Sequence, residues 1–157
     1  MHAVFCIFFC LAAALSPMAG QAAQPGSAQV VVWAGEPEKP LVCLPLEGGA
    51  RFYLDFVNSI YLAPVRETFV YEPAQGVSLV MVESPSAGVF EYYGQVPDKP
   101  GIAYLRRRIG EIRIRSHDYV NHRLTVGDRT ISFKGLVEDG EPLTIKVGRN
   151  QISNPKH

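Results

Sequence analysis

The chain has 157 residues, of which 47% are hydrophobic, and its 15 basic and 15 acidic residues give a formal net charge of zero. This length suits one domain and excludes two of ordinary size. Residues 102–134 are basic, with eight bases against three acids, but no aromatic side chain alternates with the arginines to stack on a base. We therefore exclude nucleic acid as a partner and interpret these arginines as solvent-exposed strand residues that face acids of neighbouring strands.

Residues 1–23 are predicted to be a secretory signal peptide. Residues 3–15 form an uncharged apolar run, and small residues follow it, with Gly20 and Ala22 placed for cleavage after Ala22 or Ala23. An apolar core of about 7–15 residues before small residues is the usual layout of such a peptide. The run is shorter than the roughly 20 apolar residues that span a bilayer, so an uncleaved anchor is the alternative and no stable membrane span is expected after cleavage. The sequence therefore predicts a periplasmic or secreted protein.

Proline and glycine recur along the rest of the chain, and apolar residues alternate with polar ones between them. This pattern is typical of all-β proteins, so we predict a single antiparallel β-sandwich or a partly open, barrel-like domain with little or no helix. Residues 24–40 are predicted as an N-terminal extension with the first strand, 41–148 as the β-sandwich domain and 149–157 as a flexible tail. The predicted strands are residues 29–34, 41–45, 51–58, 77–82, 111–116, 123–126, 129–133 and 142–147.

Three features lie outside this regular pattern. Gly127 and Asp128 suit a tight hairpin turn between two predicted strands. Residues 84–101 contain three prolines and three glycines, which predicts a long irregular loop of the kind that is often functional. Tyrosines around this loop suit a recognition surface, although packing of the loop explains them equally well. Cys43 is the one cysteine after the signal peptide, and its apolar neighbours predict a buried, unreactive thiol.

The end of the strand at 51–58 carries the first candidate site. Asn58 and Ser59 are short polar residues that hydrogen-bond to nearby backbone and set a turn. In the strand that follows, Arg66 and Glu67 must point to opposite faces, and an inward charge needs a partner from another strand. Two interpretations stay open at this point. One is a turn with a buried polar lock, and the other is a ligand-binding rim made by Asn58, Ser59, Tyr61, Arg66 and Glu67.

Two stretches of the chain resemble a known family. Residues 56–69 contain the end of a strand and then Pro-Val-Arg-Glu, residues 83–89 read Glu-Ser-Pro-Ser-Ala-Gly-Val, and residues 124–127 echo the second stretch. They are similar to the small exported bacterial domain-of-unknown-function family eighteen-fifty. That family shows a strand ending in His-Ser-Val, a Pro-Val-x-Glu step and a Ser-x-Gly-Ala-Gly loop. The chain departs from this pattern at Asn58, which replaces the histidine and can hydrogen-bond but cannot titrate.

The resemblance spans roughly residues 41–147 and implies an exported β domain, often encoded beside TRAP transporters of the TAXI class, with no known activity. It implies a membrane transporter or its solute-binding protein as the partner. The second motif adds Ala87 and Gly88 to the candidate binding residues. We expect the turn after Asn58 and the loop at Ala87 and Gly88 to meet in space, because glycine permits close backbone approach.

Motifs for catalysis are faint in this chain. It has no Gly-x-Ser-x-Gly elbow, P-loop, dinucleotide fingerprint or Cys-x-x-Cys pair, so no cofactor is implied. His117, Asp118 and His122 are weak candidates for metal ligands, and we interpret them as a polar hairpin loop because zinc needs three or four ligands. The sequence therefore predicts a non-enzymatic binding or accessory module of the periplasm. A small-ligand or metal-dependent enzyme is the alternative.

Overall fold

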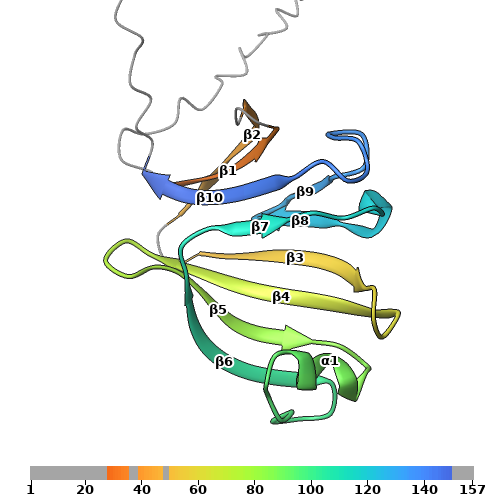
Figure 1. The fold of residues 1–157 in the computed structure, drawn as a ribbon. Helices are drawn as coiled ribbons and strands as arrows, with labels where there is room; N and C mark the ends of the chain where they lie inside the picture. The colour runs from red at the N-terminus through yellow and green to blue at the C-terminus, as the bar shows by residue number, and fades with distance from the viewer. Residues whose placement is uncertain (1–27, 36–38, 48–49, 150–157) are drawn as a thin grey trace, which may run out of the picture.

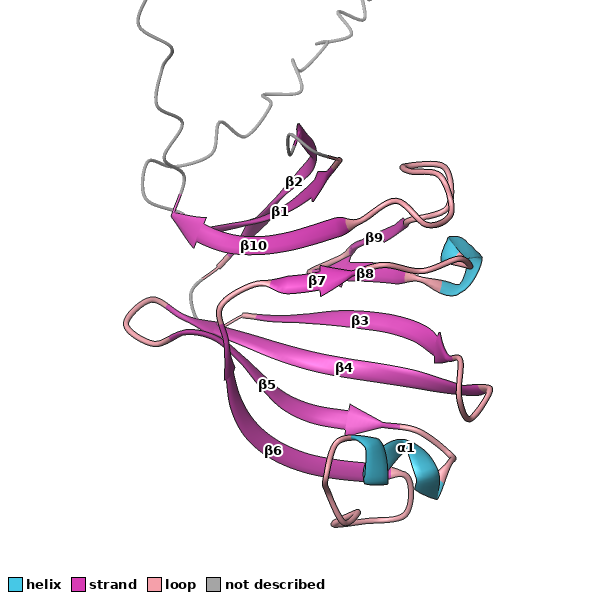
Figure 2. Cartoon of the chain, in the orientation of Figure 1, coloured by secondary structure: helices cyan, strands magenta, loops and turns pink. Residues whose placement is uncertain are grey.

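A computed structural model describes residues 28–35, 39–47 and 50–149. The predicted signal peptide and residues 150–157 of the predicted tail lie outside the described residues. The described residues are mostly β, with almost no helix, and their strands form two antiparallel sheets. The predicted all-β, sandwich-like fold is therefore confirmed (Figures 1 and 2).

The smaller sheet has four strands and contains both ends of the described chain. β1 pairs along its length with β2 on one side and with β10 on the other. β7 is short and forms the edge beside β10. In spatial order the strands are β2 (Lys39–Leu46), β1 (Ala28–Ala34), β10 (Leu143–Arg149) and β7 (Ile112–Ile114).

The larger sheet has six strands, and its members follow the predicted segments closely. Gly127 has a φ of 60° and joins two of them in the predicted hairpin, where Val126 pairs with Arg129. The first strand of the spatial order, β6, was not among the predicted strands. That order is β6 (Ile102–Ile109), β5 (Gly76–Glu83), β4 (Ala63–Glu72), β3 (Arg51–Asn58), β8 (Arg123–Val126) and β9 (Arg129–Ser132).

Two short helical turns occur in the described residues. The helix α1 (Ala87–Tyr92) lies inside the segment that was predicted to be an irregular loop, and the 3₁₀ turn η1 (Tyr119–Asn121) precedes β8. Six residues make fewer than two turns, which is too short for a helical period to be visible in a sequence. Within the described residues no helix is long and apolar enough to cross a membrane.

The core lies between the sheets and is built by the alternation that the sequence predicted. Phe52 and Leu54 of β3 are buried, and the Phe52 ring stacks on Phe69 of β4 with centroids 5.0 Å apart. Full burial of one such side chain stabilises the fold by about 1.5–3 kcal/mol. Other predicted core residues are also buried, namely Leu124, Val126, Phe133, Leu143 and Ile145, while Phe56, Ile112, Ile114, Ile131 and Val147 are partly buried.

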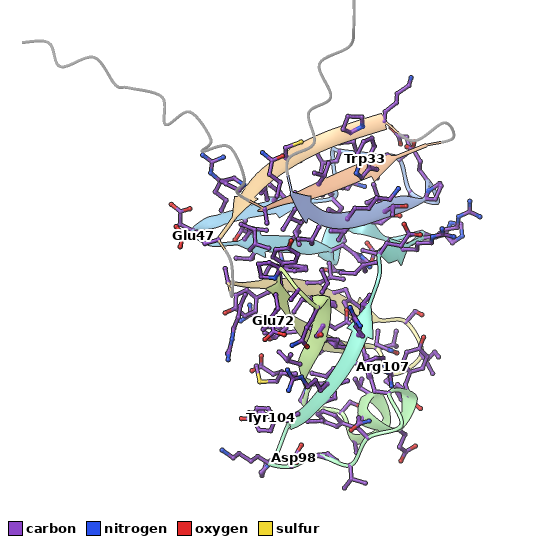
Figure 3. The ribbon with its side chains drawn as sticks, turned by 90° about the vertical axis from the view of Figure 1, so that its left-hand side faces the viewer. Trp33, Glu47, Glu72, Asp98, Tyr104 and Arg107 are labelled. Carbon is purple, nitrogen blue, oxygen red and sulfur yellow. The ribbon has the colours of Figure 1, made fainter. Side chains whose placement is uncertain are left out.

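Alternation along β6 places Arg107 on the inner side of the six-stranded sheet. Ala103 of β6 is fully buried and pairs with the buried Val82, so the alternate residues of β6, including Arg107, share its face. Leu79 is buried and pairs with Arg107. Arg107 therefore lies on the same side of the sheet as Leu79, although the residue itself is exposed. Figure 3 shows Arg107 on β6, with Tyr104 and Asp98 toward the far end of the molecule.

The expectation for Cys43 was wrong, because its side chain is exposed. β2 is the edge strand of the four-stranded sheet, and its Leu44 and Leu46 face the core while Cys43 and Pro45 face outward. The apolar neighbours of Cys43 suggested burial, but a strand of a two-layer sandwich buries only alternate residues, because the outer face of its sheet faces water.

We therefore predict that a thiol reagent modifies Cys43 rapidly in the native protein, because its side chain is exposed on the outer face of β2. Mass mapping of the labelled peptide after brief exposure to the reagent measures this. Cys43→Ser should abolish the modification and change the free energy of unfolding by less than about 0.5 kcal/mol, as expected for a surface position. Labelling that needs denaturant would instead show that the thiol is protected.

Candidate functional site: the cleft between the sheets

A cleft of about 410 Å³ opens at one end of the sandwich, between the inner face of β3 and β4 and the edge strand β7. The turn from β3 to β4 and the helix α1 lie at this end, opposite the turn from β4 to β5 (Figure 1). Its volume falls in the range of small-molecule sites, which is about 300–1,000 Å³. The lining residues are Leu54, Phe56, Val57, Asn58, Ser59, Ile60, Glu67, Tyr92, Tyr93, Ile112, Arg113, Ile114, Arg115, Ser116 and His122.

Glu67 is the acidic group of this cleft. It pairs with Leu54 of β3 and Val82 of β5, both buried, so its side chain faces the core. Burial raises the pKa of the Glu67 carboxyl, while a hydrogen bond from Tyr93 and the charge of Arg107 act in the opposite direction. The sequence predicted that either Arg66 or Glu67 would face inward and need a partner, and the structure shows that it is Glu67.

Tyr93, which follows α1, is the direct partner of Glu67. Its hydroxyl donates to Oε1 of Glu67 at 2.7 Å. Burial and the charge of Glu67 raise the pKa of Tyr93 far above its usual value, so the hydroxyl remains a donor. The guanidinium of Arg107 donates to the backbone carbonyl of Tyr93 at 3.1 Å and thereby ties β6 to the end of α1.

Asn58 forms the polar lock that one of the two interpretations required. Its side chain is 7% exposed, and its Oδ1 accepts hydrogen bonds from the backbone N–H groups of Ile60 at 2.9 Å and Tyr61 at 3.0 Å. The turn continues through Leu62, whose φ of 48° is unusual for a non-glycine residue. Asn58 therefore shapes the tip, and Ser59 and Ile60 on that tip line the mouth of the cleft.

The turn after Asn58 and the segment at Ala87 and Gly88 meet in space, as expected. A Cβ atom built on Gly88 would lie 2.2 Å from Cε1 of Tyr61. Only a glycine at this position lets the Tyr61 ring lie directly against the first turn of α1. This contact holds α1 beside the tip of the β3–β4 hairpin, and α1 in turn places Tyr93 over Glu67.

Four of the seven predicted site residues do not line the cleft: Tyr61 and Gly88 contact each other beside it, and Arg66 and Ala87 lie elsewhere. Arg66 is on the outer face of the six-stranded sheet, where its Nε donates to Oδ1 of Asp55 at 2.7 Å and its guanidinium lies over the ring of Tyr53. It borders a shallow groove of about 790 Å³ on that face. Ala87 is exposed at the start of α1 and lines neither hollow.

The residues of the histidine turn make hydrogen bonds and ring contacts with one another and with the strands. Asp118 accepts a hydrogen bond from the backbone of Val120 and so caps η1. His122 is buried, and its Nδ1 lies 2.9 Å from the carbonyl of Asp118, which makes Nδ1–H the donor. Burial lowers the pKa of His122. His117 is exposed, and the described residues contain no group of three or more potential metal ligands.

His122 also forms part of the wall of the cleft. Its ring stacks on Phe56 and Phe133 and meets Tyr119 edge-on, with centroid distances of 5.8, 6.4 and 5.4 Å respectively. These contacts fix the imidazole within an aromatic cluster beneath the cleft. The stacked rings therefore give the wall a fixed apolar shape.

Sequence reasoning missed three contributors to the cleft. Tyr93 was noted only as one of several loop tyrosines, and its alignment with Glu67 depends on the position of α1. Arg107 was one of three consecutive arginines, and β6, whose alternation sets it apart from its neighbours, was not among the predicted strands. Ile112 and Ile114 form one wall of the cleft and lie on a strand that was predicted. The position of that strand opposite β3 and β4, however, follows from sheet order alone.

Comparison with known proteins gives no further guidance. No protein-family model matches the chain, and searches of curated proteins and of solved structures return no significant match. The resemblance to the exported family stays a prediction from the two short motifs. Function must therefore be argued from the cleft itself.

The contact between Tyr61 and Gly88 predicts a coupling between these residues. Gly88→Ala alone should displace the Tyr61 ring and destabilise the protein, because the new methyl group overlaps that ring. In a Tyr61→Ala background the same change should stabilise by about 0.5–1 kcal/mol, as alanine does when it replaces glycine within a helix. Denaturant unfolding of the four proteins measures the coupling, and additive free energies would show that the two residues do not touch.

The raised pKa of Glu67 predicts a pH-dependent gain in stability for Glu67→Gln. A carboxyl whose folded pKa is raised contributes stability at low pH, and this contribution is lost as pH rises through that pKa. Glutamine keeps an acceptor for Tyr93 but cannot ionise. The variant should therefore melt at a higher temperature than the native protein at pH 8 and at a similar temperature near pH 4. A lower melting temperature at pH 8 would show that the ionised carboxylate stabilises the fold.

Proposed function

We propose that this protein is an exported, non-enzymatic binding module that captures a small molecule in the cleft between its sheets. The observation that carries the proposal is the construction of the cleft, in which apolar and aromatic walls surround a single inward carboxylate held by Tyr93. Polar groups that converge between apolar and aromatic walls are typical of small-molecule sites.

The other polar groups of this end support binding over catalysis. The amide oxygen of Asn58 is occupied by two backbone N–H groups, and Nδ1 of His122 is occupied by a carbonyl. Tyr93 has a pKa so far raised that it serves as a fixed hydrogen-bond donor and not as a proton shuttle. Because these groups already make hydrogen bonds within the protein, they favour a preformed binding site. The alternative of a small-ligand or metal-dependent enzyme has weaker support.

We also propose that the module works beside a membrane transporter or its solute-binding protein, outside the cytoplasm. This part of the proposal rests on the N-terminal apolar run and on the resemblance to the exported family. Exposed apolar side chains at the mouth of the cleft are compatible with a protein contact there, because Ile60, Leu62 and Tyr92 are 68%, 80% and 65% exposed. A ligand captured in the cleft would then lie next to the partner.

A fragment screen by nuclear magnetic resonance tests the binding function. Bound compounds should shift the amide signals of residues that line the cleft, such as Ser59, Ile60 and Arg115. Ser59→Trp places a large ring at the mouth and should weaken these compounds by about tenfold or more, which corresponds to about 1.4 kcal/mol.

The matched control is Thr130→Trp, which adds the same ring to an exposed position of the outer groove. It should leave affinity for the cleft unchanged. Compounds that shift only the outer-face signals, or that bind Ser59→Trp as tightly as the native protein, would contradict the proposal.

A further inference from the structure

We infer that the cleft selects ligands with a single protonated amine on an apolar body, and that Glu67 is the group that binds the amine. This inference rests on the proposed binding function and names the chemical class of the ligand. It follows from the carboxyl group of Glu67, which lines the cleft without an ion pair among the described residues, and from the kind of surface that surrounds it.

The carboxyl group of Glu67 has spare capacity to accept hydrogen bonds. Among the described residues, Tyr93 is its only hydrogen-bond donor and occupies Oε1, and no ion pair includes it. A carboxylate accepts at both oxygens, with about four lone-pair sites in all. Since Glu67 lines the cleft, a donor that enters the cleft can reach the remaining sites.

The charged groups around Glu67 leave a place for one cation. On β6, Arg107 is directed to the carbonyl of Tyr93 at 3.1 Å and lowers the pKa of Glu67 from a distance. The Tyr93 hydroxyl stays neutral, and burial likewise favours the neutral form of His122. An ammonium group beside Glu67 would supply the short-range positive partner that a buried carboxylate otherwise lacks.

The walls of the cleft specify what the amine is attached to. Leu54 and Phe56 of β3 face Ile112 and Ile114 of β7 across the hollow, and Tyr92 stands at its mouth. Apolar walls favour an alkyl or aryl body, because the body is removed from water on binding. An aromatic face at the rim also attracts a cation as it enters, by an interaction worth a few tenths to about 1 kcal/mol at exposed sites.

The mouth of the cleft disfavours ligands with several amines. Arg113 and Arg115 of the β7 segment line it, and Arg113 is already paired with Glu111 through two close contacts. A second ammonium group projecting toward these arginines would meet positive charge, whereas an uncharged or anionic end would not. The arrangement therefore selects for a monoamine and accepts a zwitterion with its anionic end outward.

Three compounds of nearly the same shape test the class of ligand. The probes are 2-phenylethylamine, the neutral 2-phenylethanol and the anionic 3-phenylpropionate, titrated into isotopically labelled protein at pH 7.5. A hydrogen bond to a charged group predicts roughly 10- to 100-fold tighter binding of the amine than of the alcohol. The signals that shift should be those of the cleft, together with the side-chain carboxyl carbon of Glu67.

Two variants assign the effect to Glu67. Glu67→Gln should lose the preference for the amine while keeping the weaker binding of the alcohol, because its shape and its acceptor for Tyr93 remain. The control, Glu83→Gln, removes one carboxylate from β5 opposite Arg66 on the outer face and should leave the preference intact.

The outcomes separate the two proposals. Equal or tighter binding of the alcohol or the anion in the cleft, or an amine preference that survives Glu67→Gln, would overturn the amine class and leave the cleft as a binding site. If none of the three probes shifts cleft signals, the amine class is also overturned, and the fragment screen with Ser59→Trp still decides whether the cleft binds other compounds.

Discussion

The hydrogen bond between Tyr93 and Glu67 is the interaction on which this end of the molecule depends. Strand alternation places Glu67 inside the sandwich, level with Leu54 and Val82, where an unpartnered carboxylate would be costly. The partner comes from outside the sheets, at the end of a helix of only six residues. An isolated helix of that length is not stable in water, so the contacts that hold α1 also maintain the partner of Glu67.

Those contacts come from segments far apart in the chain. The ring of Tyr61, on the tip that Asn58 shapes, lies against Gly88 at one side of α1. Arg107 of β6 bonds to the carbonyl that follows the helix. Each contact is modest, and together they position one hydroxyl within 2.7 Å of one carboxylate oxygen. Substitutions at Gly88 or in the tip of the β3–β4 hairpin can therefore alter the surroundings of Glu67 although they do not contact it.

The sequence predicted the parts of this arrangement that depend on local rules. Alternation located most strands, placed Arg66 and Glu67 on opposite faces and identified Asn58 as a turn former. It failed where the answer depends on how the sheets and α1 are arranged. Cys43 is exposed because it lies on the outer face of its sheet, and Tyr93 meets Glu67 because α1 lies beside the tip of the β3–β4 hairpin. Neither fact leaves a local signal, since each is decided by which segments lie next to one another.

His122 and Glu67, at the same end of the fold, affect stability in opposite directions as pH changes. This difference bears on the role of a carboxyl group at residue 67. Acidification destabilises the folded state through His122, because burial lowers the pKa of this histidine and the folded state resists its protonation. A rise in pH destabilises the folded state through Glu67, because the folded state favours the protonated carboxyl group. An amide at residue 67 would keep the hydrogen bond from Tyr93 and remove the second penalty. A carboxyl group retained at a stability cost is consistent with a role in binding, because a cation bound beside Glu67 would favour the ionised form and reduce that cost.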